Sequence, residues 1–257
     1  MNITKRDIVV ISAVNDRTIL DACVRRSPDI SSGAVPLIII EGATSMTKAY
    51  NEGLSRTDRD ICVLVHQDVY FPSGFFDLAL TRLDELGKRE PNWRVAGSYG
   101  VKSDGTHVGR VWDVVIGKEI GEANFQPTPV VSLDELVLIL RRDTPFKFDE
   151  QLPGWHLYGT DLVQSALEEG RTAFAIELPV VHNNRPISNL KASYSEPYRY
   201  TRRKWKQRLP IPTTIIPLSY NPWHMWQIKA GNHVDKRPDK LMADSVVVAR
   251  QAGYEPA

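Results

Sequence analysis

The stretch that decides the fold is ICVLVHQDVYFPSGFF, residues 61–76. Five apolar residues run without alternation into His66, Gln67 and Asp68, and aromatic residues follow. An uninterrupted apolar run of this length is typical of a strand that is covered on both faces, as in a parallel sheet. The stretch therefore predicts a buried strand that brings a histidine and a carboxylate to its carboxyl end.

Strand-like and helix-like segments alternate on both sides of this stretch. Strands are expected at 7–14, 35–43 and 93–101, and helices at 17–27, 44–57 and 73–90, the second of them capped by Ser45. The order β-α-β-α-β-α-β predicts an α/β fold with a mainly parallel, doubly wound sheet and helices on both faces.

The second half of the chain is less regular. We expect one or two strands within 125–143, a helix that starts near Thr160, a strand over 172–184 and a last helical segment over 238–253. From about residue 186 the composition becomes basic, aromatic and rich in proline. We therefore expect one domain over residues 1–205 and a helical or irregular C-terminal extension over 206–257 that packs on it or beside it.

The composition of the chain excludes several classes of protein. Its 257 residues are 42% hydrophobic and 25% charged, with a formal net charge of +1, so nothing in the total charge favours nucleic acid as a partner. Cys23 and Cys62 lie in apolar segments and read as buried thiols, which suits a reducing cytoplasm. No apolar run has the length of a membrane span or of a signal segment. We expect a cytoplasmic protein.

Polar residues follow four of the expected strands. They are Asn15 and Asp16 after the first strand, Glu41 after the second, His66 and Asp68 after the third, and His182 after a late one. Ligands of open α/β sheets bind outside the carboxyl ends of the strands. These side chains are therefore expected to meet at one edge of the sheet.

His66 and Asp68 are two residues apart, so in an extended chain they point to the same side. An imidazole together with a carboxylate suits a divalent ion such as Mn²⁺. The alternative is a strand-end histidine and aspartate that bind the local backbone. For His182 the alternative is a packed, hydrogen-bonded side chain.

The segment GWHLYGTDL (154–162) places Asp161 near the start of a helix. Asp161 is a candidate general base for an acceptor hydroxyl. The alternative is that Thr160 or Asp161 caps the N-terminus of the helix or places a favourable charge there. Upstream, Trp155, His156 and Tyr158 form an aromatic wall of the kind that stacks on sugar rings.

Two further features have both a functional and a plain interpretation. Lys48, near the start of the helix at 44–57, could meet a phosphate or belong to an ordinary surface, whereas the neighbouring Asn51 is framed by apolar residues. The basic, Trp-rich tail could touch an anionic membrane surface, a lipid-linked acceptor or an acidic glycan. We favour the alternative, a solvated basic face that closes over the site.

Six segments, in this order, resemble the GT-A glycosyltransferases of the family-2-like bacterial group. They are SMTKAYNEGL, VHQDVYFP, WRVAGSYG, VVSLDELVLILRR, FKFDEQLPGWHLYGTDL and VVHNN, and the resemblance runs from about residue 7 to about residue 205. It implies a GT-A fold. It also implies that the Asp-x-Asp motif of the family falls on His66, Gln67 and Asp68, with histidine in place of the first aspartate.

The resemblance assigns further roles. Asp68 and His182 would hold the metal ion that binds the donor diphosphate, and Asp161 would be the base. The nucleotide pocket would include Ser12, Asn15, Glu41, Lys48, Asn51, His66 and Gln67, with the acceptor against Trp155, His156 and Tyr158.

The function implied is inverting transfer of a sugar from a nucleoside diphosphate sugar of the UDP or GDP type, with Mn²⁺ or Mg²⁺, to a glycan or a lipid-linked glycan. The histidine at position 66 supports a second hypothesis, a GT-A module that binds nucleotide or glycan without transfer. A third, nucleotidyl transfer, is disfavoured because SAVNDRTIL (12–20) lacks the glycine-rich phosphate loop of such enzymes.

Overall fold

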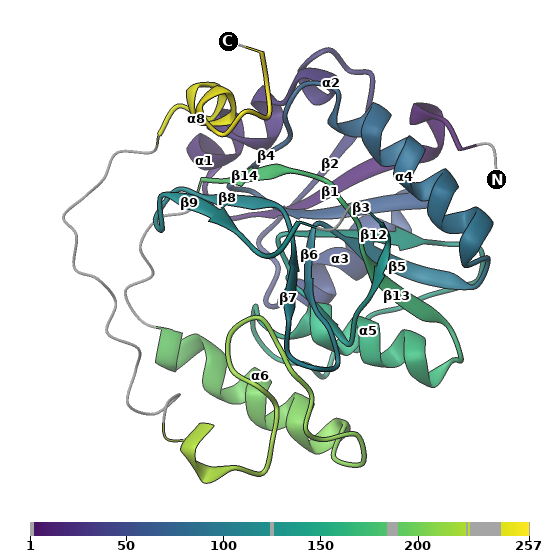
Figure 1. The fold of residues 1–257 in the computed structure, drawn as a ribbon, viewed down its shortest axis with the longest axis vertical. Helices are drawn as coiled ribbons and strands as arrows, with labels where there is room; N and C mark the ends of the chain where they lie inside the picture. Colours follow the sequence, from purple (N-terminus) through teal and green to yellow (C-terminus); the bar gives the residue numbers. More distant parts are fainter. Residues whose placement is uncertain (1–2, 124–125, 184–189, 225, 227–242, 257) are drawn as a thin grey trace.

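The computed structural model describes residues 3–123, 126–183, 190–224, 226 and 243–256. A large central sheet has the strand order β10-β13-β5-β12-β3-β1-β2 (Figure 1). Its strands are β1 (Ile8–Val14), β2 (Leu37–Glu41), β3 (Ile61–His66), β5 (Trp93–Gly97), β10 (Thr128–Pro129), β12 (Val137–Arg141) and β13 (Thr172–Ala175).

Most strands of this sheet run in one direction. β1 pairs in parallel with β2 and β3, and β13 pairs in parallel with β5. β12 lies antiparallel between β3 and β5, and β10 lies antiparallel to β13. The expected mainly parallel sheet is confirmed, with β10 and β12 as its antiparallel members.

Helices cover both faces of the sheet (Figure 1). The helices are α1 (Arg17–Ala22), α2 (Pro28–Ser31), α3 (Met46–Ser55), α4 (Phe75–Arg89), α5 (Tyr158–Glu168), α6 (Leu190–Lys204) and α8 (Ser245–Gln251), with 3-10 turns η1 (Lys5–Asp7) and η2 (Val24–Arg26). α1, α2 and α4 pack on the face that carries Val10 and Val63, whereas α3 and α5 pack on the face that carries Ile11 and Leu64. Alternate residues of β1 and β3 are thus buried on opposite faces, which explains why their apolar runs are uninterrupted.

α3 lies unusually close to β1. A Cβ atom added at Gly53 would lie 2.3 Å from Cγ2 of Ile11, so only glycine lets the helix backbone approach the strand at this point. The helix begins after Ser45, whose hydroxyl accepts a hydrogen bond from the N–H of Lys48, as expected for an N-cap. This packing fixes the loop between β2 and α3 at the carboxyl edge of the sheet.

Two small sheets lie beside the central one. One has the order β4-β14-β8-β9 and the other the order β11-β6-β7. Their strands are β4 (Val69–Tyr70), β6 (Tyr99–Val101), β7 (His107–Gly109), β8 (Val111–Asp113), β9 (Lys118–Ile120), β11 (Ser132–Leu133) and β14 (Val180–His182). The strand expected over 172–184 is therefore two strands, since β13 stays in the central sheet while β14 pairs with β4 and β8.

The C-terminal part packs on the domain in two places. Tyr194, Tyr198 and Trp205 share a buried cluster with Leu157 and Ile211, so residues on both sides of the expected boundary at 205–206 pack together. α8 covers β4 and β14 and forms the described part of the helix expected over 238–253. Residues 227–242 of the tail lie outside the described residues.

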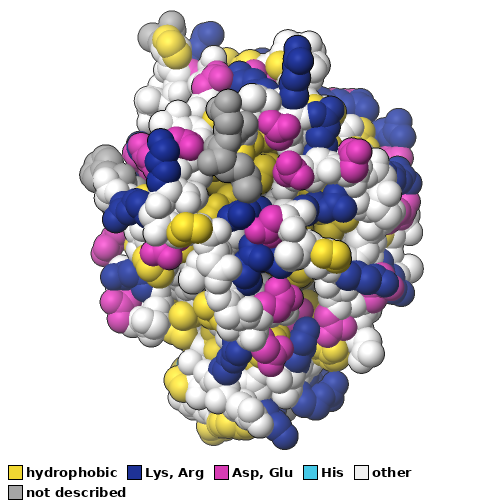
Figure 2. Space-filling view, turned by 90° about the vertical axis from the view of Figure 1, so that its right-hand side faces the viewer, with side chains coloured by type: hydrophobic (Ala, Val, Ile, Leu, Met, Phe, Trp, Pro, Cys, Tyr) yellow, Lys and Arg dark blue, Asp and Glu magenta, His cyan; other side chains and the backbone are white. Residues whose placement is uncertain are grey.

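The surface carries charges of both signs. Figure 2 shows Lys and Arg side chains interspersed with Asp and Glu side chains over the face that it presents. Cys23 and Cys62 are buried free thiols, as expected. Among the helices of the described ranges, none combines the length and the apolar character that crossing a membrane requires.

Candidate functional site

A cavity of about 370 Å³ lies at the carboxyl ends of β1, β2 and β3. Its lining includes Asn15, His66, Gln67, Asp68, Trp155 and His156. The strand-end side chains expected at one edge of the sheet are thus partly brought together, and the segment before α5 closes the other side. The cavity combines a carboxylate, imidazoles and an indole in one concave surface.

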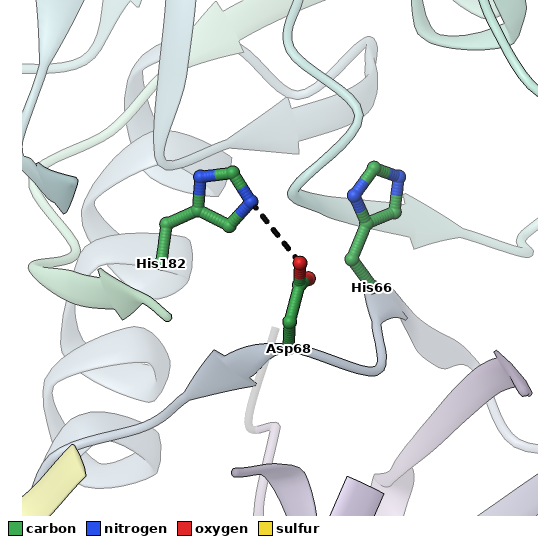
Figure 3. A group of neighbouring side chains, drawn as sticks. All are labelled: His66, Asp68 and His182. Carbon is green, nitrogen blue, oxygen red and sulfur yellow. Dashed lines mark ion pairs between the residues drawn. The ribbon is translucent and has the colours of Figure 1, made fainter. Parts of the chain in front are cut away.

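Three side chains form a compact cluster beside this cavity. Donor atoms of His66, Asp68 and His182 all lie within 4.8 Å of one another, and Figure 3 shows the side chains converging. Nε2 of His182 is 3.5 Å from Oδ2 of Asp68. The backbone holds them in register, because the N–H of Asn183 donates to the carbonyl of Asp68 at 2.8 Å and His182 pairs with Val69. His182 therefore belongs to the small sheet β4-β14-β8-β9 and not to the central sheet.

Asp113 contacts the ring nitrogen of His182 that does not face Asp68. Nδ1 of His182 lies 3.2 Å from Oδ2 of Asp113, and the N–H of Ile116 donates to the other carboxylate oxygen at 2.8 Å. A carboxylate can only accept, so Nδ1 of His182 carries a proton and Nε2 is the nitrogen that faces Asp68. Sequence reasoning missed Asp113. The only sign of Asp113 in the sequence is an acid at the end of the short stretch VWD. It lies next to His182 because β8 pairs with β14, and this pairing cannot be read from the local sequence.

The electrostatics of the cluster are those of a tight charge pair. Burial lowers the pKa of His182, but Asp68 and Asp113 outweigh this and raise it to about 10. Burial raises the pKa of Asp68, but His182 outweighs this and lowers it to about 2. Burial lowers the pKa of His66, which favours its neutral form. The cluster thus holds an ionised carboxylate between a charged and a neutral imidazole.

These residues fit a divalent metal ion. Oδ1 of Asp68 is buried, and no described residue forms a hydrogen bond with it. Nε2 of His182 would offer a lone pair once its proton leaves. An oxygen without a partner next to an imidazole that is oriented by a second carboxylate is the arrangement found around protein-bound metal ions.

Removal of the charge of Asp113 is expected to weaken metal binding without removing a ligand. In Asp113→Asn the imidazole of His182 loses the carboxylate that orients it. The affinity for Mn²⁺ is expected to fall by about 10–100-fold, the usual effect of losing such a partner. Calorimetric titration with MnCl₂ measures this, and an unchanged affinity would contradict the role given to Asp113.

Gln67 binds the loop after β1. Its Nε2 donates to Oδ1 of Asn15 at 2.6 Å, and its Oε1 accepts from the N–H groups of Asn15 and Asp16 at 3.0 and 3.1 Å. Gln67 and Asn15 also line the cavity. Gln67 therefore fixes the shape of the cavity floor.

Ser12 and Glu41 lie near the cavity but are not among its lining residues. Ser12 is fully buried within β1, and no described residue forms a hydrogen bond with its hydroxyl. Glu41 is exposed and accepts two hydrogen bonds from Arg17, at 2.7 and 2.6 Å, which lower the pKa of its carboxyl.

The aromatic segment before α5 divides into two parts. Trp155, 41% exposed, and His156 line the cavity, and Nε2 of His156 lies 3.1 Å from the hydroxyl of Ser193. Tyr158 is instead 1% exposed, and its hydroxyl lies 2.8 Å from Nε2 of His66. The expectation that Tyr158 belongs to an open sugar-binding wall is therefore wrong, since Leu157 adopts a left-handed conformation (φ 67°) and the chain then turns Tyr158 into the core.

Asp161 lies in the first turn of α5, 3% exposed. Its Oδ1 accepts a hydrogen bond from the indole N–H of Trp205 at 2.8 Å, and its Oδ2 accepts from Nζ of Lys204 at 3.0 Å. Burial raises the pKa of Asp161, partly offset by Lys204. The N-cap of α5 is Leu157, so neither Thr160 nor Asp161 caps the helix, but Asp161 is the acidic residue of its first turn, as the alternative of a charge at the helix N-terminus expects. Asp161 is not among the residues that line the cavity.

Lys48 and Asn51 lie outside this cavity. The amide of Asn51 donates to the carbonyl of Phe148 at 3.0 Å and accepts from its N–H at 2.8 Å, which ties the loop 146–150 to α3. Lys48 is exposed, and its Nζ lies 3.3 Å from the hydroxyl of Thr44. Both residues line a separate depression with Arg142. The structure therefore does not bring them to the His66–Asp68–His182 cluster.

Sequence comparison finds relatives over most of the chain. Residues 9–207 match a family described as "Glycosyltransferase like family". A curated relative from Fuscovulum blasticum, "ATP synthase subunits region ORF 6", is 27% identical over 164 residues, which cover 58% of this chain and 64% of the relative. The chain thus spans less than two thirds of the length of that relative.

Solved structures resemble this chain at low sequence identity. GalNAc-T7, solved with UDP, GalNAc and Mn²⁺, has a TM-score of 0.50 and 12% identity over 79% of this chain and 51% of its own. The mannosyltransferase PcManGT from Pyrobaculum calidifontis, solved with GDP-Man and Mn²⁺, has a TM-score of 0.46 and 12% identity over 77% of this chain and 64% of its own. The fold is GT-A, as expected. Because the matched residues make up well over half of its length, the chain belongs to the glycosyltransferase-like family.

Proposed function

We propose that this protein transfers a sugar from a nucleoside diphosphate sugar to a hydroxyl acceptor, with a divalent metal ion held by Asp68 and His182. One observation carries the proposal: Asp68, with a buried oxygen that no described residue binds, and His182 meet beside a cavity at the carboxyl ends of β1–β3. GalNAc-T7, which shares the fold, was solved with UDP and Mn²⁺, and this supports the donor class.

The proposed chemistry assigns a task to each part of the cavity. Transfer breaks the bond between the anomeric carbon and the diphosphate, which leaves with additional negative charge. A divalent ion neutralises charge of this kind. Asp68 and His182 would hold the ion, and Asp113 would keep His182 oriented. Asn15, fixed by Gln67, would meet the nucleoside part of the donor, with Glu41 near the same end of the cavity.

We propose Asp161 as the base for the acceptor hydroxyl. It is buried, its pKa is raised, and it follows the cavity residue His156 by five residues in the sequence. Lys204 and Trp205 occupy both of its oxygens. An acceptor hydroxyl must therefore replace Lys204 at Oδ2 before Asp161 takes its proton. Attack from the side opposite the diphosphate gives inversion of configuration at the anomeric carbon.

The acceptor is proposed to be a glycan or a lipid-linked glycan. Trp223 and Trp226 are stacked on each other and each is 55% exposed, so they offer aromatic surface to such an acceptor or to an anionic membrane surface. The last turn of α6 adds the basic residues Arg202, Arg203 and Lys204. The buried free thiols Cys23 and Cys62 suit a reducing compartment such as the cytoplasm.

A specific observation favours one competing function. Because Lys204 and Trp205 hold Asp161, the chain could bind a nucleotide sugar without transferring the sugar. Incubation with UDP- and GDP-sugars and Mn²⁺, followed by measurement of the nucleoside diphosphate released, separates the two functions. Metal-dependent release from one donor supports transfer, whereas binding without release from any donor supports the non-catalytic module.

Metal affinity is expected to rise with pH. The pKa of His182 is raised to about 10, so at neutral pH its imidazole is protonated and must lose a proton to bind an ion. Protons compete less as the pH rises toward that value, and the apparent affinity is expected to increase by up to about tenfold per pH unit. Calorimetry with Mn²⁺ in two buffers of different ionisation enthalpy measures both the slope and the proton released. An affinity that is flat with pH would contradict His182 as a ligand.

A further inference from the structure

His66 occupies a position from which it can bind the same ion as Asp68 and His182. It ends β3, two residues before Asp68, and one of its ring nitrogens belongs to the group of donor atoms that lie within 4.8 Å of one another. Figure 3 shows one ring nitrogen of His66 on the side of the Asp68 carboxylate and the other turned away from it. Whether the nearer nitrogen can act as a ligand depends on which of the two carries the proton.

The contacts of Tyr158 determine where that proton lies. The hydroxyl of Tyr158 donates to the backbone carbonyl of Glu135 at 3.2 Å, and a carbonyl can only accept. The phenol oxygen must therefore accept the Nε2–H of His66, 2.8 Å away. In a neutral imidazole the other nitrogen, Nδ1, then has the free lone pair. Tyr158 is 1% exposed, so this arrangement is fixed by the core.

The two histidines of the cluster are held in the same manner. Nδ1 of His182 donates to Asp113, and Nε2 of His66 donates to Tyr158. The far nitrogen of each ring is thus bound by a buried partner, and the near nitrogen is left for a ligand. With Oδ1 of Asp68, the cluster presents two imidazole nitrogens and one carboxylate oxygen.

This set of donors discriminates between metal ions. Mg²⁺ binds through oxygen ligands and keeps several of its waters, whereas imidazole suits the first-row transition metals. A site with one carboxylate and two imidazoles also has less negative charge than a site with two carboxylates, and Mg²⁺ depends most on that charge.

We propose that His66 is the third ligand of the metal site, and that it makes the site select a transition-metal ion such as Mn²⁺ over Mg²⁺. The proposal rests on the metal-dependent function proposed above. His66 is then a residue that determines which metal the protein uses, in addition to any contact that it makes with the donor.

The test is a pair of calorimetric titrations of the full chain, with MnCl₂ and with MgCl₂, in the absence of nucleotide. The wild-type protein is expected to bind Mn²⁺ at least about tenfold more tightly than Mg²⁺. In His66→Asp, which restores a second carboxylate, the affinity for Mg²⁺ is expected to rise and the preference for Mn²⁺ to fall by about tenfold. The electron paramagnetic resonance spectrum of bound Mn²⁺ is expected to change in the same variant.

Tyr158→Phe provides a second variant that keeps the volume of the core. Loss of the hydroxyl frees Nε2 of His66, so the affinity for Mn²⁺ is expected to fall by about 10-fold or more. Equal wild-type affinities for the two ions, or a preference that His66→Asp leaves unchanged, would overturn the role of His66 while leaving a metal site at Asp68. Binding of neither ion by the wild-type protein would overturn the proposed function as well.

Discussion

Asp68→Asn is expected to abolish metal-dependent binding of a nucleoside diphosphate. The substitution keeps the size of the side chain but removes the charge of the carboxylate in the His66–Asp68–His182 cluster, whose pKa of about 2 keeps it ionised. The affinity of the site for Mn²⁺ is expected to fall by at least about 100-fold, since a ligand contributes no less than the partner that orients one. Calorimetry with UDP and with GDP, with Mn²⁺ and with a chelator, measures the loss.

Asp58→Asn is the matched control, because Asp58 is an exposed carboxylate just before the start of β3, at the other end of that strand from His66, and it is not among the residues that line the cavity. It removes the same charge and is expected to leave nucleotide binding unchanged. Thermal unfolding of both variants establishes that each one folds. If Asp68→Asn bound the nucleotide as the wild-type protein does, in the presence of Mn²⁺, the diphosphate would not lie at this cluster.

Asp161→Asn is expected to reduce turnover by about 10²–10⁴-fold, the usual contribution of a general base, while leaving metal-dependent nucleotide binding unchanged. The amide can still accept the hydrogen bond of Trp205, but it cannot take a proton from an acceptor. The rate at which the preferred donor releases its nucleoside diphosphate measures the effect.

Lys204→Gln distinguishes the effect of the Asp161 carboxylate from the effect of its ion pair with Lys204. It removes the cation that binds Asp161 and leaves the carboxylate in place. Its turnover is expected to stay within about tenfold of the wild-type value, because the proposed reaction already displaces Lys204 from Asp161 and the other ion pair of Lys204, with the partly exposed Asp149, contributes little. Equal losses in Asp161→Asn and Lys204→Gln would indicate that the pair acts through structure, and the base would then be another residue.

The sequence predicts the central sheet well because both of its faces are covered. The uninterrupted apolar runs of β1 and β3 indicate that alternate side chains are buried on opposite faces of the sheet, as they are. The same runs cannot report strand direction, so β12, which is equally apolar, gave no sign that it runs antiparallel between β3 and β5. Nor could they report that β14 leaves the central sheet to pair with β4, since pairing depends on distant partners.

The site shows the same limit. His66 and Asp68 were recognisable because their two-residue spacing is a local property of a strand. The roles of Asp113 and Tyr158 depend on which residues face them across the fold, which no local pattern contains. Lys48 and Asn51 sit on a correctly predicted helix, but its packing turns them toward the loop 146–150 and away from the cavity.

The central claim is that Asp68 and His182 hold a metal ion at the diphosphate of the donor. Anomalous diffraction at the manganese edge, from crystals of the full chain grown with Mn²⁺ and the nucleoside diphosphate that binds in solution, tests it most directly. The account predicts one strong peak in contact with the side chains of Asp68 and His182 and with the diphosphate. A bound nucleotide with the manganese peak at other side chains, or with no peak, would contradict it.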